Sequence, residues 1–134
     1  MVYKHIVMWK FKEQHNGKSA LENARWMKEQ LEGLVGVVPE LLSAEVGISP
    51  ALEQAAAVQS NAAAAQSNAA AAPSNAAAAP AQAASGEYDA CLVSTFASPE
   101  ALAAYKVHPK HKAISAYCKE ARVKRLAFDW WSEE

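Results

Sequence analysis

The sequence is short of the features that mark secreted and membrane proteins. It has only two cysteines in 134 residues. Two thiols cannot build the disulfide framework of a small secreted domain, so Cys91 and Cys118 are expected to be reduced thiols of a cytoplasmic protein. No run of 18 strongly apolar residues occurs, so we expect no membrane-spanning helix. Charges interrupt the N-terminal segment 1–10 too early for a signal peptide.

Neither sign of charge is in excess. There are 13 Lys and Arg against 14 Asp and Glu, which gives a formal net charge of −1. Domains that bind nucleic acid or a membrane surface usually gather positive charge on one face. We therefore expect neither nucleic acid nor a membrane as a partner. The length indicates one domain covering residues 1–134.

One amino acid dominates one segment of the chain. Residues 51–84 contain 19 of the 31 alanines, and the sequence Ser-Asn-Ala-Ala-Ala-Ala recurs with a period of seven between Ser60 and Ala79. A coiled coil has the same period but needs large apolar side chains at two positions per heptad. Alanine favours helix, whereas Pro73 and Pro80 interrupt it. We interpret residues 51–84 as a solvated low-complexity insert with nascent helix in its first half. The alternative is a helical arm that packs on a neighbour.

The remaining 100 residues alternate between strand and helix patterns. Ser19 and Glu22 form a capping-box signature ahead of apolar residues at helical spacing. Ser98-Pro99 is a typical helix start, and Pro109 is well placed to begin another helix. The predicted strands are 2–11, 41–48, 88–96 and 123–131, and the predicted helices are 19–35, 100–107 and 110–121.

This order, β-α-β-β-α-α-β, predicts an α+β fold of the ferredoxin-like kind with a four-stranded antiparallel sheet. Its helices can cover only one face of that sheet. The first strand is nevertheless apolar on both faces, with Ile6 and Met8 on one and Val7 and Trp9 on the other. We expect a second copy to cover the uncovered face, giving a homodimer through sheet-to-sheet packing.

Several segments together resemble the stress-responsive α/β-barrel domain family (Dabb). The most specific is His108-Pro109-Lys110-His111 after a short Ala-rich helix, and the others are 4–12, 39–47, 88–89, 96–102 and 125–129. The resemblance covers nearly all residues outside the insert and is strongest to small bacterial members. It implies a dimeric α+β barrel in which two four-stranded sheets face each other.

The resemblance also implies candidate site residues. In a plant polyketide cyclase of this family, the catalytic Tyr and His match Tyr105 and His111, and a supporting His matches His5. Its intramolecular aldol chemistry uses a His base and a Tyr donor and requires no metal or other cofactor. We therefore consider His111 and Tyr105 as catalytic residues, and His5, Trp9 and Phe128 as ligand-binding residues for a small apolar ligand.

A structural interpretation of the same residues stays open. His111 can be a helix-terminal His bonded to the backbone, and Tyr105 and His5 can be core residues of a non-enzymatic stress or assembly protein.

No Cys or carboxylate is spaced to complete a metal set with His108 and His111. A haem-degrading or quinol-oxidising monooxygenase is a third class, by fold analogy. Four lysines are interpreted as a solvated basic face: Lys106, Lys110, Lys112 and Lys119.

Overall fold

The structure, a computed structural model, describes residues 1–60 and 87–133. Four strands form one antiparallel sheet in the order β4-β5-β1-β6. Their bounds are β1 Val2–Phe11, β4 Ser43–Ile48, β5 Ala90–Phe96 and β6 Arg122–Ser132. The first strand of the chain thus lies inside the sheet between two later strands, as the ferredoxin-like topology requires. The predicted α+β fold is confirmed.

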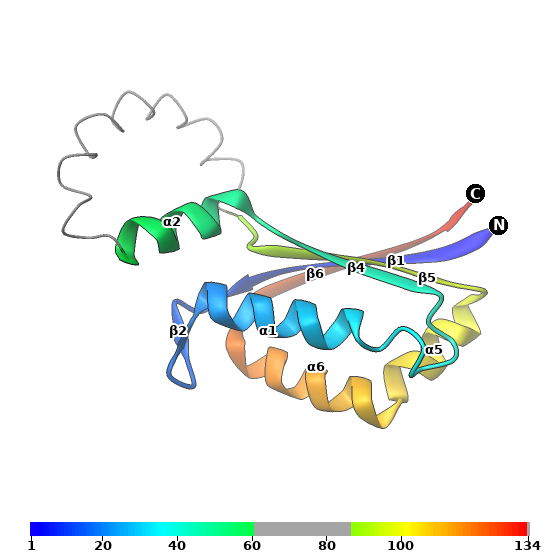
Figure 1. The fold of residues 1–134 in the computed structure, drawn as a ribbon. Helices are drawn as coiled ribbons and strands as arrows, with labels where there is room; N and C mark the ends of the chain where they lie inside the picture. Colours follow the sequence, from blue (N-terminus) through cyan, green and yellow to red (C-terminus); the bar gives the residue numbers. More distant parts are fainter. Residues whose placement is uncertain (61–86, 134) are drawn as a thin grey trace.

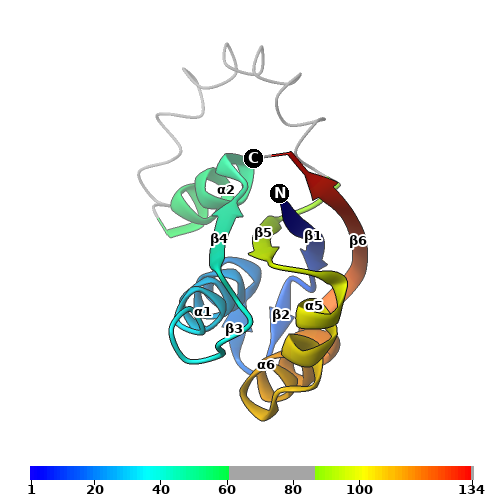
Figure 2. The same ribbon diagram turned by 90° about the vertical axis from the view of Figure 1, so that its right-hand side faces the viewer.

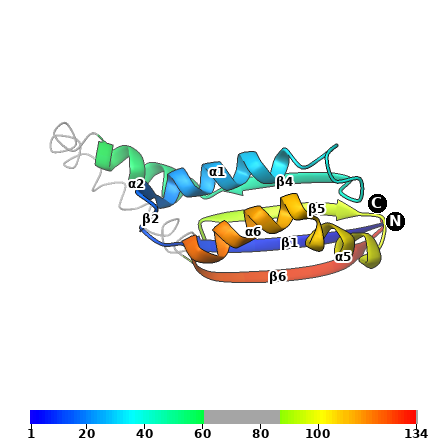
Figure 3. The same ribbon diagram turned by 90° about the horizontal axis from the view of Figure 1, so that it is seen from below.

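Three helices cover one face of this sheet (Figure 1): α1 (Ala20–Glu32), α5 (Pro99–Val107) and α6 (Pro109–Ala121). Viewed from below, α1 runs along β4, and α6 runs along the half of the sheet that contains β1 (Figure 3). The end-on view shows all three on the same side of the strands (Figure 2). No helix in the described part of the chain is long and apolar enough to cross a membrane.

Local capping signals explain where α1 begins and ends. Ser19 Oγ accepts a hydrogen bond from the Glu22 amide at 3.1 Å, and Glu22 Oε1 accepts one from the Ser19 amide at 2.9 Å. The helix ends at Gly33, earlier than predicted, because the Gly33 amide closes the last turn on Glu29. Before the helix, Asn16 and Gly17 have positive φ and connect the short strands β2 (Gln14–His15) and β3 (Lys18–Ser19).

Helices α5 and α6 meet at one residue. The backbone amide of His108 donates to the Tyr105 carbonyl and ends α5. The His108 ring then caps α6, since its Nδ1 accepts from the Lys110 amide at 3.2 Å. Pro109 takes the first helical position, where a missing amide hydrogen costs nothing. This junction places Tyr105 in the last turn of one helix and His111 in the first turn of the next.

The two faces of the sheet differ in burial. On the helix-covered face, alternate strand residues are buried against the helices, among them Val7, Trp9, Val46, Leu92 and Phe96. The opposite face, which we call the open face, carries Ile6, Met8, Val93, Leu126 and Phe128. Leu126 is 50% exposed and Phe128 is 62% exposed. The sheet therefore has apolar residues on both faces, as predicted.

The first part of the Ala-rich segment is helical. Helix α2 spans Pro50–Ser60 and extends beyond the end of β4 (Figure 1). Leu52 packs against the core, and Glu53 lies 3.7 Å from Arg25 of α1 in an ion pair. The rest of residues 51–84 falls outside the described residues, so the interpretation as a solvated insert stays a prediction.

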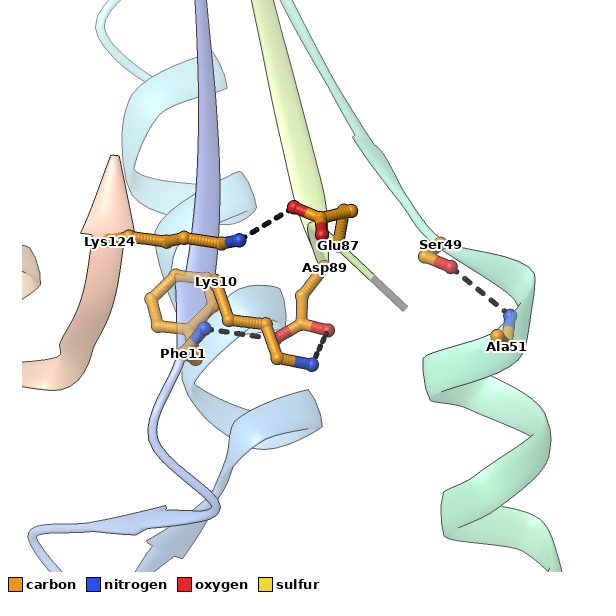
Figure 4. Close-up of polar contacts among 7 residues, drawn as sticks. All are labelled: Lys10, Phe11, Ser49, Ala51, Glu87, Asp89 and Lys124. Carbon is orange, nitrogen blue, oxygen red and sulfur yellow. Dashed lines mark hydrogen bonds and ion pairs between the residues drawn. The ribbon is translucent and has the colours of Figure 1, made fainter. Parts of the chain in front are cut away.

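Asp89 fixes the point at which the chain re-enters the sheet (Figure 4). Its carboxylate is buried and accepts a hydrogen bond from the Phe11 amide at 2.9 Å. Lys10 Nζ lies 3.3 Å from the other carboxylate oxygen. The Asp89 backbone also bonds to Trp9 and Ser49. These contacts join the ends of β1, β4 and β5. They therefore fix the position at which β5 begins to pair with its two neighbouring strands.

Candidate functional site

A cavity of about 240 Å³ lies between the helix-covered face of the sheet and α5–α6. This volume is near the low end of the range for small-molecule pockets. The apolar residues that line it are Val7, Trp9, Leu31, Leu92, Ile114 and Cys118. The polar residues that line it are His5, Lys106, His111, Ser115, Arg122 and Arg125. The cavity thus combines an apolar wall with a basic set of side chains.

His5 lies in the middle of β1, directly opposite Asp129 of β6. Its Nδ1 is 2.5 Å from Asp129 Oδ1. An ionised carboxylate only accepts hydrogen bonds, so Nδ1 carries the proton and Nε2 keeps its lone pair. Burial lowers the pKa of His5, and the bond to Asp129 opposes that shift. His5 is therefore a neutral imidazole with a fixed tautomer at neutral pH.

His111 is held in the same way from the other wall. Its Nδ1 lies 3.2 Å from the Lys106 carbonyl oxygen, which can only accept, so Nε2 is again the basic nitrogen. Burial lowers the pKa of His111, the bond to the Lys106 carbonyl opposes that shift, and the charges of Lys106 and Arg125 add to it. The predicted backbone bond of this His is thus present, and the ring also lines the cavity.

Tyr105 is fully buried beside His111, with the two ring centroids 4.3 Å apart. Its other ring neighbour is Phe96, at 5.1 Å. The hydroxyl has no hydrogen-bond partner among the described residues. Burial raises the pKa of Tyr105, so the hydroxyl stays protonated and can only act as a neutral donor or acceptor. Tyr105 backs His111 but is not among the residues that line the cavity.

The unpaired hydroxyl leads to a stability prediction. We expect Tyr105→Phe to leave the free energy of unfolding unchanged or to raise it by about 1 kcal/mol, because a buried unpaired polar group is removed. Tyr117→Phe is the matched control, since the Tyr117 hydroxyl donates to Asn23 Oδ1 at 2.5 Å and its loss should cost about 1 kcal/mol. Urea unfolding measures both. A loss for Tyr105→Phe as large as that for Tyr117→Phe would contradict the prediction.

The structure does not bring Phe128 together with the other predicted residues. Trp9 lines the cavity with His5 and His111. Phe128 pairs in register with Ile6, one residue out of phase with His5, so its side chain points to the open face. The sheet therefore separates Phe128 from the cavity.

Five further polar residues of the site were not predicted for it. Asp129 orients His5, and Arg122, Arg125 and Ser115 line the cavity. Lys106 also lines the cavity, although it was interpreted as part of a solvated face. The sequence of β6 contained a signal for two of them. Side chains alternate between the two faces along a strand, so Arg125 and Asp129 lie on the face opposite to Leu126 and Phe128.

The cavity also contains a thiol, that of Cys118. Burial raises the pKa of Cys118 to about 12, which keeps it protonated and removes it as a nucleophile at neutral pH. No group of three or more His, Cys, Asp or Glu side chains that could hold a metal ion is present in residues 1–60 and 87–133.

Solved structures with the same fold include proteins from bacteria and plants. A dimeric protein of unknown function with a ferredoxin-like fold from Bacteroides fragilis is 20% identical, with a TM-score of 0.66, over 98% of this chain and 96% of that chain. A hydroxynitrile lyase from Passiflora edulis is 15% identical, with a TM-score of 0.63, over 99% and 95%. A Dabb family protein from Mesorhizobium loti is 14% identical, with a TM-score of 0.57, over 99% and 98%.

No curated protein matches the sequence. The sequence does match one protein family, described as the stress responsive A/B barrel domain (Dabb), over residues 3–62 and 74–132. Apart from Val2, the first residue of β1, these two segments include the four strands of the sheet and the helices that cover it. The chain therefore belongs to the stress-responsive A/B barrel domain family, Dabb.

Proposed function

We propose that this protein binds a small carbonyl compound in the cavity and acts on it as a cofactor-independent lyase or cyclase. The observation that carries the proposal is the pair of imidazoles. His5 and His111 approach one cavity from opposite walls, and each has its Nδ1 engaged and its Nε2 left for a ligand. Two neutral imidazoles that line one cavity are suited to proton transfer at neutral pH.

The proposed chemistry begins with proton removal next to a carbonyl. His111 Nε2 takes the proton from that carbon, and negative charge develops on the carbonyl oxygen as an enolate forms. Tyr105 packs against His111 behind the cavity wall, so we assign it the role of positioning that base rather than of contacting the substrate. His5, oriented by Asp129, binds the substrate from the sheet side. In a cyclase the enolate carbon then attacks a second carbonyl of the same substrate, and the alkoxide that forms takes the proton back from His111. In a lyase these steps run in reverse: His111 takes the proton of a β-hydroxyl group, the carbon–carbon bond breaks to release a carbonyl compound and an enolate, and the enolate carbon takes the proton back.

A protein of the same fold provides support for this class of reaction. The Passiflora edulis protein is described as a hydroxynitrile lyase. At 15% identity the likeness concerns the fold, so we rest the reaction on the cavity of this chain. The competing interpretation, in which the same residues only stabilise a non-enzymatic assembly protein, predicts no acceleration of proton exchange in the assay that follows.

Hydrogen–deuterium exchange tests the proposal directly. The probe is 2-hexanone in D₂O, and NMR follows the loss of the protons on the carbons beside its carbonyl. We expect the protein to accelerate exchange by about 10²-fold over free imidazole at the same concentration, a typical contribution of a positioned base. Exchange no faster than with imidazole would show that the cavity does not perform this proton transfer.

We further propose that the protein is a homodimer in which the open faces of two sheets pack together. Leu126 and Phe128 are half exposed or more, and an apolar surface of this kind is usually an interface. Proteins of the same fold from Bacteroides fragilis and Thermobifida fusca are described as dimeric. We also propose a cytoplasmic location, since Cys91 and Cys118 are both unpaired.

A further inference from the structure

Three permanent cations surround the cavity. Lys106 lies in the last turn of α5, Arg122 follows the last residue of α6, and Arg125 lies in β6. All three line the cavity, and no carboxylate does. Within the described ranges, none of the three forms an ion pair with an Asp or Glu side chain.

The fold brings these cations to one place from two elements, α5 and β6. Arg125 is opposite Trp9 in the register of β1 and β6, so it shares the helix-covered face with the buried core. Arg122 is paired with Phe11 just beyond a register shift and stands where α6 passes into β6. Lys106 reaches the same cavity from α5, and its own backbone carbonyl holds the ring of His111.

Electrostatics indicates that the positive charges act on one another. Burial and the charge of Arg122 lower the pKa of Arg125, and the charge of Asp129 opposes that shift only in part. Lys106 and Arg125 both lower the pKa of His5 and of His111. Like charges that are partly removed from water repel one another, and an anion bound among them would relieve this repulsion.

We infer that the ligand of this cavity is a small organic acid with an apolar chain, whose carboxylate binds to Lys106, Arg122 and Arg125. The inference rests on the proposed function and specifies its substrate class. Arginine donates two parallel hydrogen bonds to a carboxylate, which makes two arginines and a lysine a strong donor set for one carboxylate. The apolar chain packs along the wall of Val7, Leu92 and Ile114, and a carbonyl in that chain lies toward His5 and His111.

Calorimetry with a matched pair of six-carbon probes tests the inference. Hexanoate carries the carboxylate, and hexanamide has the same chain and nearly the same shape without the charge. We expect the native protein to bind hexanoate at least about tenfold more tightly than hexanamide, because charge-assisted hydrogen bonds are the stronger ones. Raising the salt concentration should weaken hexanoate binding and leave hexanamide binding unchanged.

Variants assign the effect to the three cations. Arg125→Gln and Lys106→Gln should each lower hexanoate affinity by about tenfold. Lys119→Gln is the control, since Lys119 belongs to α6 but does not line the cavity, and it should change nothing. Unchanged hexanamide binding shows that each variant keeps an intact cavity.

Three results would overturn the inference. The first is equal affinity for hexanoate and hexanamide in the native protein, and the second is an equal loss of hexanoate affinity in the Lys119→Gln control. Hexyl phosphate provides a third comparison, and binding more than tenfold tighter than hexanoate would reject the carboxylate. The 2-hexanone exchange assay is independent of these measurements, because its probe has no charge. If the protein does not prefer hexanoate but accelerates exchange into 2-hexanone, the proposed function stands and only the assignment of an organic acid as the ligand is rejected.

Discussion

Replacing His111 by glutamine is expected to slow deuterium exchange into 2-hexanone by about 10²-fold. Glutamine keeps a polar side chain of similar length but has no nitrogen that accepts a proton at neutral pH. The bond between the side chain and the Lys106 carbonyl can still form, since the glutamine amide donates. The variant therefore removes the base and keeps the hydrogen bond, and NMR measures the remaining rate.

The same reaction should have a characteristic pH dependence. The neutral form of His111 is the base, and burial together with nearby cations lowers its pKa below the ordinary value of 6.5. The exchange rate should therefore be constant above about pH 6.5 and fall only when the pH drops through the lowered pKa. A rate that already falls between pH 8 and pH 7 would contradict the assignment of a neutral imidazole.

Two control variants separate His111 from other histidines. His15→Gln changes a residue that packs on Tyr117 and does not line the cavity, so the rate should not change. His5→Gln should reduce the exchange rate less than His111→Gln does, because His5 is proposed to bind the substrate, whereas His111 removes the proton. The reverse order of the two losses would move the base to the His5–Asp129 pair and overturn the proposed role of His111.

The double variant Leu126→Glu, Phe128→Glu is expected to turn the dimer into monomers. Both side chains lie on the open face and are half exposed or more in the single subunit. In the proposed dimer each would be buried against the partner sheet, where an unpaired carboxylate loses its hydration. We expect the dimer dissociation constant to rise by at least about 10³-fold, since two charges per subunit are affected.

Sedimentation equilibrium at micromolar concentration measures this change. Val107→Glu is the matched control, because Val107 is 65% exposed but ends helix α5 on the opposite side of the sheet. That variant should remain as dimeric as the native protein. A native protein that sediments as a monomer, or an unchanged dimer in the double variant, would refute packing through the open face.

Much of the fold could be predicted because its signals are local. The Ser19–Glu22 capping box and the Ser98-Pro99 pair each predict a helix start from neighbouring residues, and the structure has helices there. Alternation along 2–11 predicted both faces of β1 correctly. The end of α1 was missed because Gly33 closes the last turn before the apolar spacing ends. Helix α2 was predicted only as nascent helix, since alanine and proline give opposing signals in residues 51–84.

The candidate site could be predicted only in part, because its assembly depends on register. His5, His111 and Tyr105 were considered from the sequence; His5 and His111 line one cavity, and Tyr105 packs against His111 outside the cavity lining. Asp129 was not predicted for the site, because it is 124 positions from His5 and meets it only through the pairing of β1 with β6. Arg125 joins the cavity by the same register. Phe128 was assigned to the ligand although the pleat of β6 directs it to the opposite face.

The shared terminus of α5 and α6 has a consequence for ligand entry. His108 ends one helix with its backbone and begins the next with its ring, so a rotation of either helix must break a hydrogen bond at the same residue. Tyr105 and His111 stand on the two sides of this joint. Their relative orientation is thus fixed before any ligand arrives, and a ligand that enters does not lose binding energy in assembling them.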